Sequence, residues 1–261
     1  MHGSRTIPSP ADDPLSAHDS SGAGRNRSTG SEARIGKPAT LSDPLGHPTV
    51  IDLRRAVRSR PASEQGRVER AYRIAERAHR GQARDEGSPY IEHPLRVALI
   101  VADELERPEP DLICAALLHD VVEDTPVTLA EVQEACGDTV AHFVELLTKA
   151  KVADPDEKRL ATRRYLHRIA ADSPEMLLLK LADRLDNLRS VAVLPDPDKR
   201  RKYLLETYWQ YLPIAKRGGI YFYEQYKSLL AGYLRAHADE LRLRVEDFPE
   251  LTGGIETRRN S

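Results

Sequence analysis

An apolar segment that runs into four ionisable residues places the strongest constraint on what this chain can fold into. Residues 112–118, Leu-Ile-Cys-Ala-Ala-Leu-Leu, are apolar on every face of a helix, which is typical of a helix buried inside a core. The ionisable residues that follow are His119, Asp120, Glu123 and Asp124. Burying such groups is costly unless a partner compensates their charge. Because imidazole and carboxylate are both metal ligands, the pattern predicts a divalent cation as that partner.

Helical spacing divides these four residues into two pairs. Residues four positions apart lie on one face of a helix, so His119 is expected beside Glu123, and Asp120 beside Asp124. One pair could bind the ion while the acids that follow hold or activate its water. A lone His-Asp pair is weak evidence for a metal site. The same chain contains another such pair, His18-Asp19, in a polar segment where no site is expected.

The remaining signals of local structure are helical. Pro94, Pro110 and Pro174 stand where apolar periodic runs begin, a position at which a helix tolerates the missing N–H of proline. Ser173 is a candidate N-cap and Gly137 a candidate helix end. We find no convincing alternation with a period of two, so we expect an all-α fold of about eight to ten helices.

Composition divides the chain near residue 62. The first aromatic residue is Tyr72, and seven of the 18 prolines precede it. Such a segment cannot bury enough apolar surface to offset its ordering entropy. We therefore expect a mostly disordered tail over residues 1–62, with a short helix around 50–57. The folded domain is expected over residues 63–245 and a second tail over 246–261.

Charge and hydropathy exclude several classes of protein. The formal charge of −2 argues against a dedicated nucleic-acid-binding domain. The apolar runs are far shorter than the ~18 residues that span a bilayer, and the first residues lack the apolar stretch of a signal peptide. Two cysteines, Cys114 and Cys136, provide no disulfide framework and favour a reducing, cytoplasmic location. We expect no nucleic-acid or membrane partner, and a homo-oligomer stays open.

Two other segments carry polar residues that could join residues 119–124. The turn-rich loop 82–94 ends at a helix start and can present His93 on a fixed backbone. Farther along, Asp183 and Asn187 stand four positions apart on a helix that begins near Pro174, and therefore face the same way. Read alone, this second segment is equally consistent with a charged amphipathic helix that carries ordinary surface ion pairs.

Together these segments resemble the HD-superfamily metal phosphohydrolases. They look most like the hydrolase domain of RelA/SpoT-type alarmone enzymes and the small alarmone hydrolases. The resemblance extends from about residue 78 to about residue 226. It includes the Gln-x-Arg loop at residues 82–84 and three longer motifs: Pro-Tyr-Ile-x-His-Pro, Ala-Leu-Leu-His-Asp-Val-Val-Glu-Asp-Thr and Lys-Leu-Ala-Asp-Arg-Leu-x-Asn-Leu-Arg. It implies an HD-domain helical bundle. It also implies metal-dependent hydrolysis of the 3′-pyrophosphate of guanosine 3′,5′-bis(diphosphate) or pentaphosphate, which gives GDP or GTP plus pyrophosphate.

The resemblance also implies roles for individual residues. The implied ligands of one Mn²⁺ ion are His93, His119, Asp120 and Asp183. The acids implied to orient and deprotonate the attacking water are Glu123 and Asp124. The residues implied to contact the nucleotide are Arg84, which would stack on guanine, Asn187 and Ser190.

One feature departs from the family pattern. A basic residue commonly follows the stacking arginine, whereas here Asp85 and Glu86 follow Arg84. Two acids beside a highly anionic substrate weaken its binding unless cations compensate. The candidate compensating cations are Lys149, Lys151, Arg159 and Arg163. Two alternatives therefore stay open: a phosphohydrolase for another nucleotide, such as NADPH or an adenosine alarmone, and a non-catalytic regulatory binding protein.

Overall fold

The computed structural model describes residues 46–106, 108–149 and 155–251. Most of the predicted N-terminal tail and residues 252–261 of the predicted C-terminal tail lie outside these ranges, so both expectations stay predictions there. Within them, no β-strand occurs, and one isolated antiparallel bridge joins Ala83 to Pro89. The all-α prediction is confirmed.

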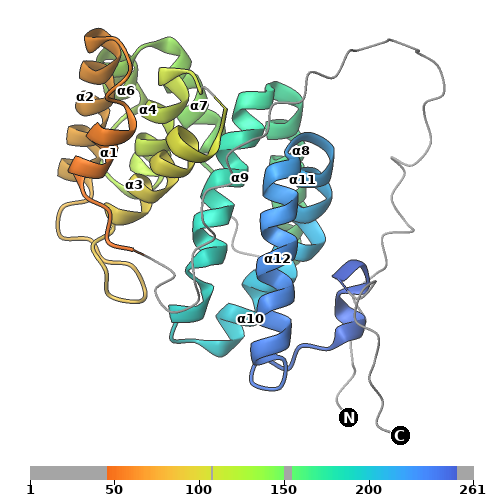
Figure 1. Ribbon diagram of the computed structural model, residues 1–261. Helices are drawn as coiled ribbons and strands as arrows, with labels where there is room; N and C mark the ends of the chain where they lie inside the picture. The colour runs from red at the N-terminus through yellow and green to blue at the C-terminus, as the bar shows by residue number, and fades with distance from the viewer. Residues whose placement is uncertain (1–45, 107, 150–154, 252–261) are drawn as a thin grey trace, which may run out of the picture. The chain divides into compact units, whose positions relative to one another are not determined.

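The described residues form a series of helices in chain order (Figure 1). The α-helices are α1 (Val50–Ala56), α2 (Ala62–Ala78), α3 (Glu92–Leu99), α4 (Pro110–Leu118), α5 (Val121–Asp124), α6 (Leu129–Cys136), α7 (Asp138–Leu147), α8 (Pro155–Asp172), α9 (Pro174–Arg189), α10 (Pro197–Glu206), α11 (Leu212–Gly218) and α12 (Ile220–His237). The π-helices are η3 (Ile100–Glu104) and η5 (Thr207–Tyr211). The 3₁₀-helices are η4 (Val191–Val193), η6 (Val245–Asp247) and η7 (Pro249–Leu251).

Several helix ends follow the local signals of the sequence. Pro110 and Pro174 are the first residues of α4 and α9. The Ser173 hydroxyl accepts a hydrogen bond from the Met176 amide at 3.2 Å, as an N-cap does. Gly137 separates α6 from α7 with a φ of 95°, a left-handed value that favours glycine. Proline and glycine therefore determine where these helices begin and end.

Two helices form the centre of the packing. The apolar helix α4 packs against α2, α3 and α7, and its residues from Leu112 to Leu118 are fully or almost fully buried, as predicted. Helix α9 contacts α3 and α4, and it also contacts α8, α11 and α12 (Figure 1). Because α9 has neighbours on several sides, even its charged residues Lys180 and Asp186 are buried. The ends of α3 and α4 and the middle of α9 thus lie close together.

The packed region is longer at both ends than the predicted 63–245. The helix expected around residues 50–57 is present as α1, and its Leu53 packs into the core with an exposed fraction of 1%. Beyond residue 245, Phe248 and Leu251 are buried in the same core. Composition could not place these boundaries, because a few apolar residues in a polar segment suffice to attach it. No helix in the described residues has the length and apolarity to cross a bilayer.

The packing of α4 leads to a prediction about Cys114. None of its surface is exposed, and burial raises the pKa of its thiol to about 12. At pH 8 the thiol form therefore dominates strongly over the thiolate, which is the form that reacts with disulfide reagents. We expect dithionitrobenzoate to leave Cys114 unmodified in the native protein and to modify it in urea, as read by peptide mass spectrometry. Rapid modification of the native protein would contradict the buried α4.

Candidate active site

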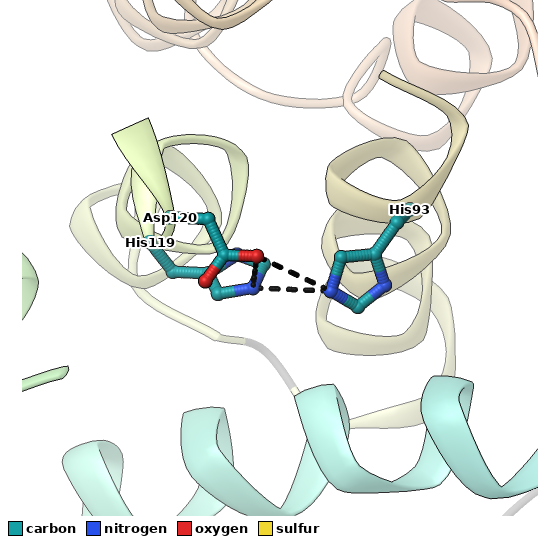
Figure 2. Close-up of side chains that lie close together, drawn as sticks. All are labelled: His93, His119 and Asp120. Atoms are coloured by element: carbon teal, nitrogen blue, oxygen red, sulfur yellow. Dashed lines mark hydrogen bonds and ion pairs between the residues drawn. The ribbon is translucent and has the colours of Figure 1, made fainter. Parts of the chain in front are cut away.

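The predicted metal ligands converge where α3, α4 and α9 meet. Figure 2 shows His93 pointing toward His119 and Asp120, with 3.2 Å between the Nε2 atoms of the two histidines. Asp120 Oδ2 lies 3.1 Å from His119 Nε2 and 3.6 Å from His93 Nε2. Asp183, from α9, brings its Oδ1 to 3.4 Å from His93 Nε2 and 3.9 Å from His119 Nε2. Residues separated by up to 90 positions therefore present two imidazoles and two carboxylates to one point.

The hydrogen bonds of the two rings determine what their Nε2 atoms can do. His119 Nδ1 donates to the Ala116 carbonyl at 2.8 Å, and His93 Nδ1 donates to Asp186 Oδ2 at 2.7 Å. Each neutral ring therefore carries its proton on Nδ1 and a lone pair on Nε2. Lone pairs and carboxylate oxygens at these separations repel unless a positive charge lies among them. The donor set accordingly fits a divalent metal ion.

The pKa values in this cluster indicate the same need for positive charge. Burial alone would lower the pKa of His119, but the charges of Asp120 and Asp183 raise it to about 9. Burial alone would raise the pKa of Asp183, but the Lys180 ammonium, 2.6 Å from its Oδ2, holds it well below its usual value. Burial would also raise the pKa of Asp120, but the charge of His119 and its hydrogen bond lower it, so both aspartates are ionised near neutral pH. Without a metal, a proton on His119 supplies the positive charge of the cluster, and a bound metal ion would displace that proton.

The backbone at the His-Asp pair differs from the expected continuous helix. Helix α4 ends at Leu118, residues 119 and 120 form a turn, and α5 begins at Val121. The reason is local: His119 Nδ1 bonds to the Ala116 carbonyl, the acceptor that a continued helix would offer to the Asp120 amide. The regular helix is therefore interrupted at residues 119 and 120, and the turn aims both polar side chains at α3. The Asp124 amide still donates to the Asp120 carbonyl at 2.9 Å, so the helical spacing predicted for these two acids is kept.

Sequence reasoning missed Tyr90 as a residue of the site. Its hydroxyl lies 2.7 Å from Asp120 Oδ2 and 3.1 Å from Asp124 Oδ2, so those two acids still face the same side. Its ring stacks on His79 at 4.5 Å between centroids. Burial and the two acids raise the pKa of Tyr90, which therefore stays a hydrogen-bond donor. The signal was present in the Pro-Tyr-Ile-x-His-Pro motif, from which only His93 was assigned.

The two predicted catalytic acids lie beside the cluster. Glu123 and Asp124 line the same cavity, of about 300 Å³, as His119, Asp120 and Asp183. Glu123 Oε2 accepts a hydrogen bond from the Lys149 backbone amide at 3.0 Å, which fixes the carboxylate at the cavity wall. A cavity that combines metal ligands with further carboxylates can hold an ion, a water molecule and a proton acceptor together.

The structure places only two of the three predicted nucleotide contacts at the cavity. Arg84 and Asn187 line it, and Arg84 Nη2 donates to Asn187 Oδ1 at 2.8 Å. Asn187 Nδ2 also donates to Asp183 Oδ1 at 2.6 Å, which connects this end of the cavity to the ligand cluster. Ser190 is buried, and its hydroxyl donates to the Asp186 carbonyl at 2.8 Å. It lies in the packing of α9 rather than at the cavity wall.

The unusual acids after Arg84 are both paired. Asp85 lines the cavity and forms an ion pair with Lys199 of α10. Glu86 does not line the cavity, and its Oε1 lies 3.3 Å from Arg84 Nε and 2.9 Å from the Ser88 hydroxyl. Their charges are therefore partly compensated by Lys199 and Arg84, neither of which belongs to the predicted set of compensating cations.

The cations of the cavity differ from the predicted set. Lys149 lines the cavity as predicted, and Lys180 and Arg184 line it without having been predicted. Lys151 and the Arg159 side chain lie outside the described residues, and Arg163 does not line this cavity. Among the cations that line the cavity, Lys180 is paired with Asp183 and Arg184 with Glu206.

Comparison with known proteins places this site in a family. The HD domain family matches residues 71–221. The bifunctional (p)ppGpp synthase/hydrolase SpoT of Escherichia coli (strain K12) is 40% identical over 164 residues, which cover 62% of this chain and 23% of SpoT. The guanosine-3′,5′-bis(diphosphate) 3′-pyrophosphohydrolase of Aquifex aeolicus (strain VF5) is 42% identical over 154 residues, 59% of this chain and 22% of that protein. The matched region is thus less than a quarter of either relative.

A solved structure shares the fold. It is described as a metazoan ortholog of SpoT that hydrolyzes ppGpp and plays a role in starvation responses, and it aligns with 74% of this chain and 96% of its own, at 26% identity and a TM-score of 0.50. The fold and the cluster of histidines and aspartates therefore define a helical domain built around a divalent-metal site. The chain belongs to the HD-domain family. Within that family it is a homologue of the SpoT-type proteins.

Proposed function

We propose that this chain removes the 3′-pyrophosphate of guanosine 3′,5′-bis(diphosphate) and pentaphosphate, giving GDP or GTP plus pyrophosphate, with Mn²⁺ as the metal. One observation carries the proposal: two imidazoles and two carboxylates meet, and three of these four groups line one cavity together with two further acids. The relatives named after this reaction support the choice of substrate. The two free cysteines support a reducing, cytoplasmic location.

In this proposal His93, His119, Asp120 and Asp183 hold the ion, and the mixture of imidazole and carboxylate suits Mn²⁺. A divalent ion there supplies Lewis-acid activation of water and of the scissile phosphoryl group. Every other part comes from side chains. Glu123 or Asp124 accepts the proton that the attacking water releases. The Tyr90 hydroxyl holds Asp124 toward the cavity, 3.1 Å away.

The nucleotide would lie across the remaining walls of the cavity. The planar guanidinium of Arg84 can stack on a guanine base, and a lysine would not replace it well. Lys149 and Lys180 lie 5.3 Å and 5.4 Å from the centroid of the Tyr165 ring, so two ammonium groups contact one aromatic ring, and Lys180 also pairs with the ligand Asp183. This arrangement would attract the pyrophosphate toward the ligand cluster.

A nucleotide panel tests this function. We expect the purified, metal-stripped protein to be inactive and to release pyrophosphate from guanosine tetraphosphate when Mn²⁺ is added. Anion-exchange chromatography should identify GDP as the second product. NADPH and an adenosine alarmone serve as parallel substrates because Asp85 is an acid at the cavity wall. Phosphate release from NADPH alone would assign another substrate, and binding without turnover would assign a regulatory protein.

A further inference from the structure

Asp186 is a buried carboxylate next to the candidate metal centre that is neither a proposed ligand nor a proposed base. It lies on α9, three residues after Asp183, and only 1% of its surface is exposed. Its Oδ2 accepts a hydrogen bond from His93 Nδ1 at 2.7 Å. Its Oδ1 accepts one from Arg96 Nε, also at 2.7 Å. Both partners lie on α3, so one buried carboxylate joins the two helices directly behind the candidate metal centre.

This hydrogen bond determines which nitrogen of His93 can bind a cation. A neutral imidazole carries one proton, on either Nδ1 or Nε2. A carboxylate behind Nδ1 favours the form with the proton on Nδ1, because only that form donates to it. The lone pair then lies on Nε2, which is 3.4 Å from Asp183 Oδ1 and 3.6 Å from Asp120 Oδ2. The opposite form would place a proton among the metal ligands.

Arg96 fixes the orientation of the carboxylate. Its Nε donates a hydrogen bond to Oδ1, which leaves Oδ2 free to accept from His93. The positive charge of the guanidinium compensates the charge of the buried carboxylate. The Arg96 side chain is itself 9% exposed, and it does not line the cavity. Its contribution therefore acts on the carboxylate and not on a ligand in the cavity.

We propose that Asp186 is a positioning residue of the metal centre, which holds the His93 ring and its proton so that Nε2 faces the ion. The inference rests on the proposed metal site and adds a residue outside its four ligands. Carboxylates that accept the second N–H of a ligating histidine orient the ring and increase its basicity. Neither Asp186 nor Arg96 was singled out by the sequence, because their contact joins two helices about 90 residues apart.

The test is direct Mn²⁺ binding to the metal-stripped protein, measured by electron paramagnetic resonance of the free ion. We expect Asp186→Asn to weaken binding by about 10- to 100-fold, the usual cost of losing such a partner. Arg96→Gln is the matched variant, since it breaks the same contact between helices but leaves the acceptor of His93. We expect it to lose less affinity. Equal losses in both variants, or none in Asp186→Asn, would overturn the proposal.

A second measurement covers the case in which Asp186→Asn does not fold. Long-range ¹H–¹⁵N spectra of the metal-stripped wild-type protein at alkaline pH report which nitrogen of neutral His93 carries the proton. The Nδ1–H form supports the proposal and the Nε2–H form overturns it. Failure of the proposed function gives a different result: the wild-type protein then binds no Mn²⁺, or binds it without releasing pyrophosphate, while the spectra still report on Asp186.

Discussion

Replacing Asp183 by alanine is expected to abolish both metal binding and turnover. Asp183 is one of the two carboxylates of the cluster, and its Oδ1 lies 3.4 Å from His93 Nε2. An ion held by the remaining groups loses a charged ligand and its fixed geometry. Because a catalytic metal contributes several kcal/mol to the transition state, we expect a loss in rate of about a thousandfold or more. Pyrophosphate release and bound Mn²⁺ after gel filtration are the measurements.

The alanine variant has a second effect that must be separated from the first. Asp183 Oδ2 is the partner of the buried Lys180 ammonium, and removing one half of a buried ion pair costs about 3–5 kcal/mol of stability. Asp183→Asn keeps an acceptor for Lys180 and should therefore melt closer to the wild type, while still failing to bind metal. Asp198→Asn, at an exposed position of α10, is the matched control. Tight Mn²⁺ binding by a folded Asp183→Asn would refute the ligand assignment.

The parts of the fold that depend on local chemistry were predictable. Pro110, Pro174 and Ser173 begin helices, and Gly137 separates two, because each residue acts on its own few neighbours. The interruption after Leu118 was not predictable from spacing, since it depends on the His119 ring competing for a backbone carbonyl. The packing of α1 on the core depends on the burial of Leu53, and the average composition of the polar segment around it gives no sign of that one contact.

The candidate site shows the same division. Spacing related His119 to its immediate neighbours, but bringing His93 and Asp183 to them required the resemblance to a family. Tyr90 stood in a recognised motif, yet its hydrogen bond to Asp120 comes from tertiary packing, which no single-segment pattern encodes. The Lys180–Asp183 pair is different, because the two residues stand three positions apart on α9, a spacing that was visible in the sequence but was not used. Ser190 shows the opposite case, because a position that matches the family motif is buried in this chain and bonds to its own helix.

Replacing Glu123 by glutamine is expected to separate proton transfer from metal binding. Glu123 lines the cavity and is not one of the four proposed ligands, and its Oε2 accepts a hydrogen bond from the Lys149 amide. Glutamine keeps that acceptor but cannot take a proton at neutral pH. Since a positioned base contributes about 10²–10⁴-fold to the rate, we expect kcat to fall by that factor while Mn²⁺ affinity stays unchanged.

The neighbouring acid decides how this result is interpreted. Asp124 lines the same cavity and is held by Tyr90, so it is the other candidate base. Asp124→Asn is therefore measured beside Glu123→Gln, and Glu145→Gln on the exposed side of α7 serves as the matched control. Full activity in Glu123→Gln with a large loss in Asp124→Asn would transfer the role to Asp124. Weakened Mn²⁺ binding in Glu123→Gln would instead make Glu123 part of the metal site, because the loss of a group that only accepts a proton does not change Mn²⁺ affinity.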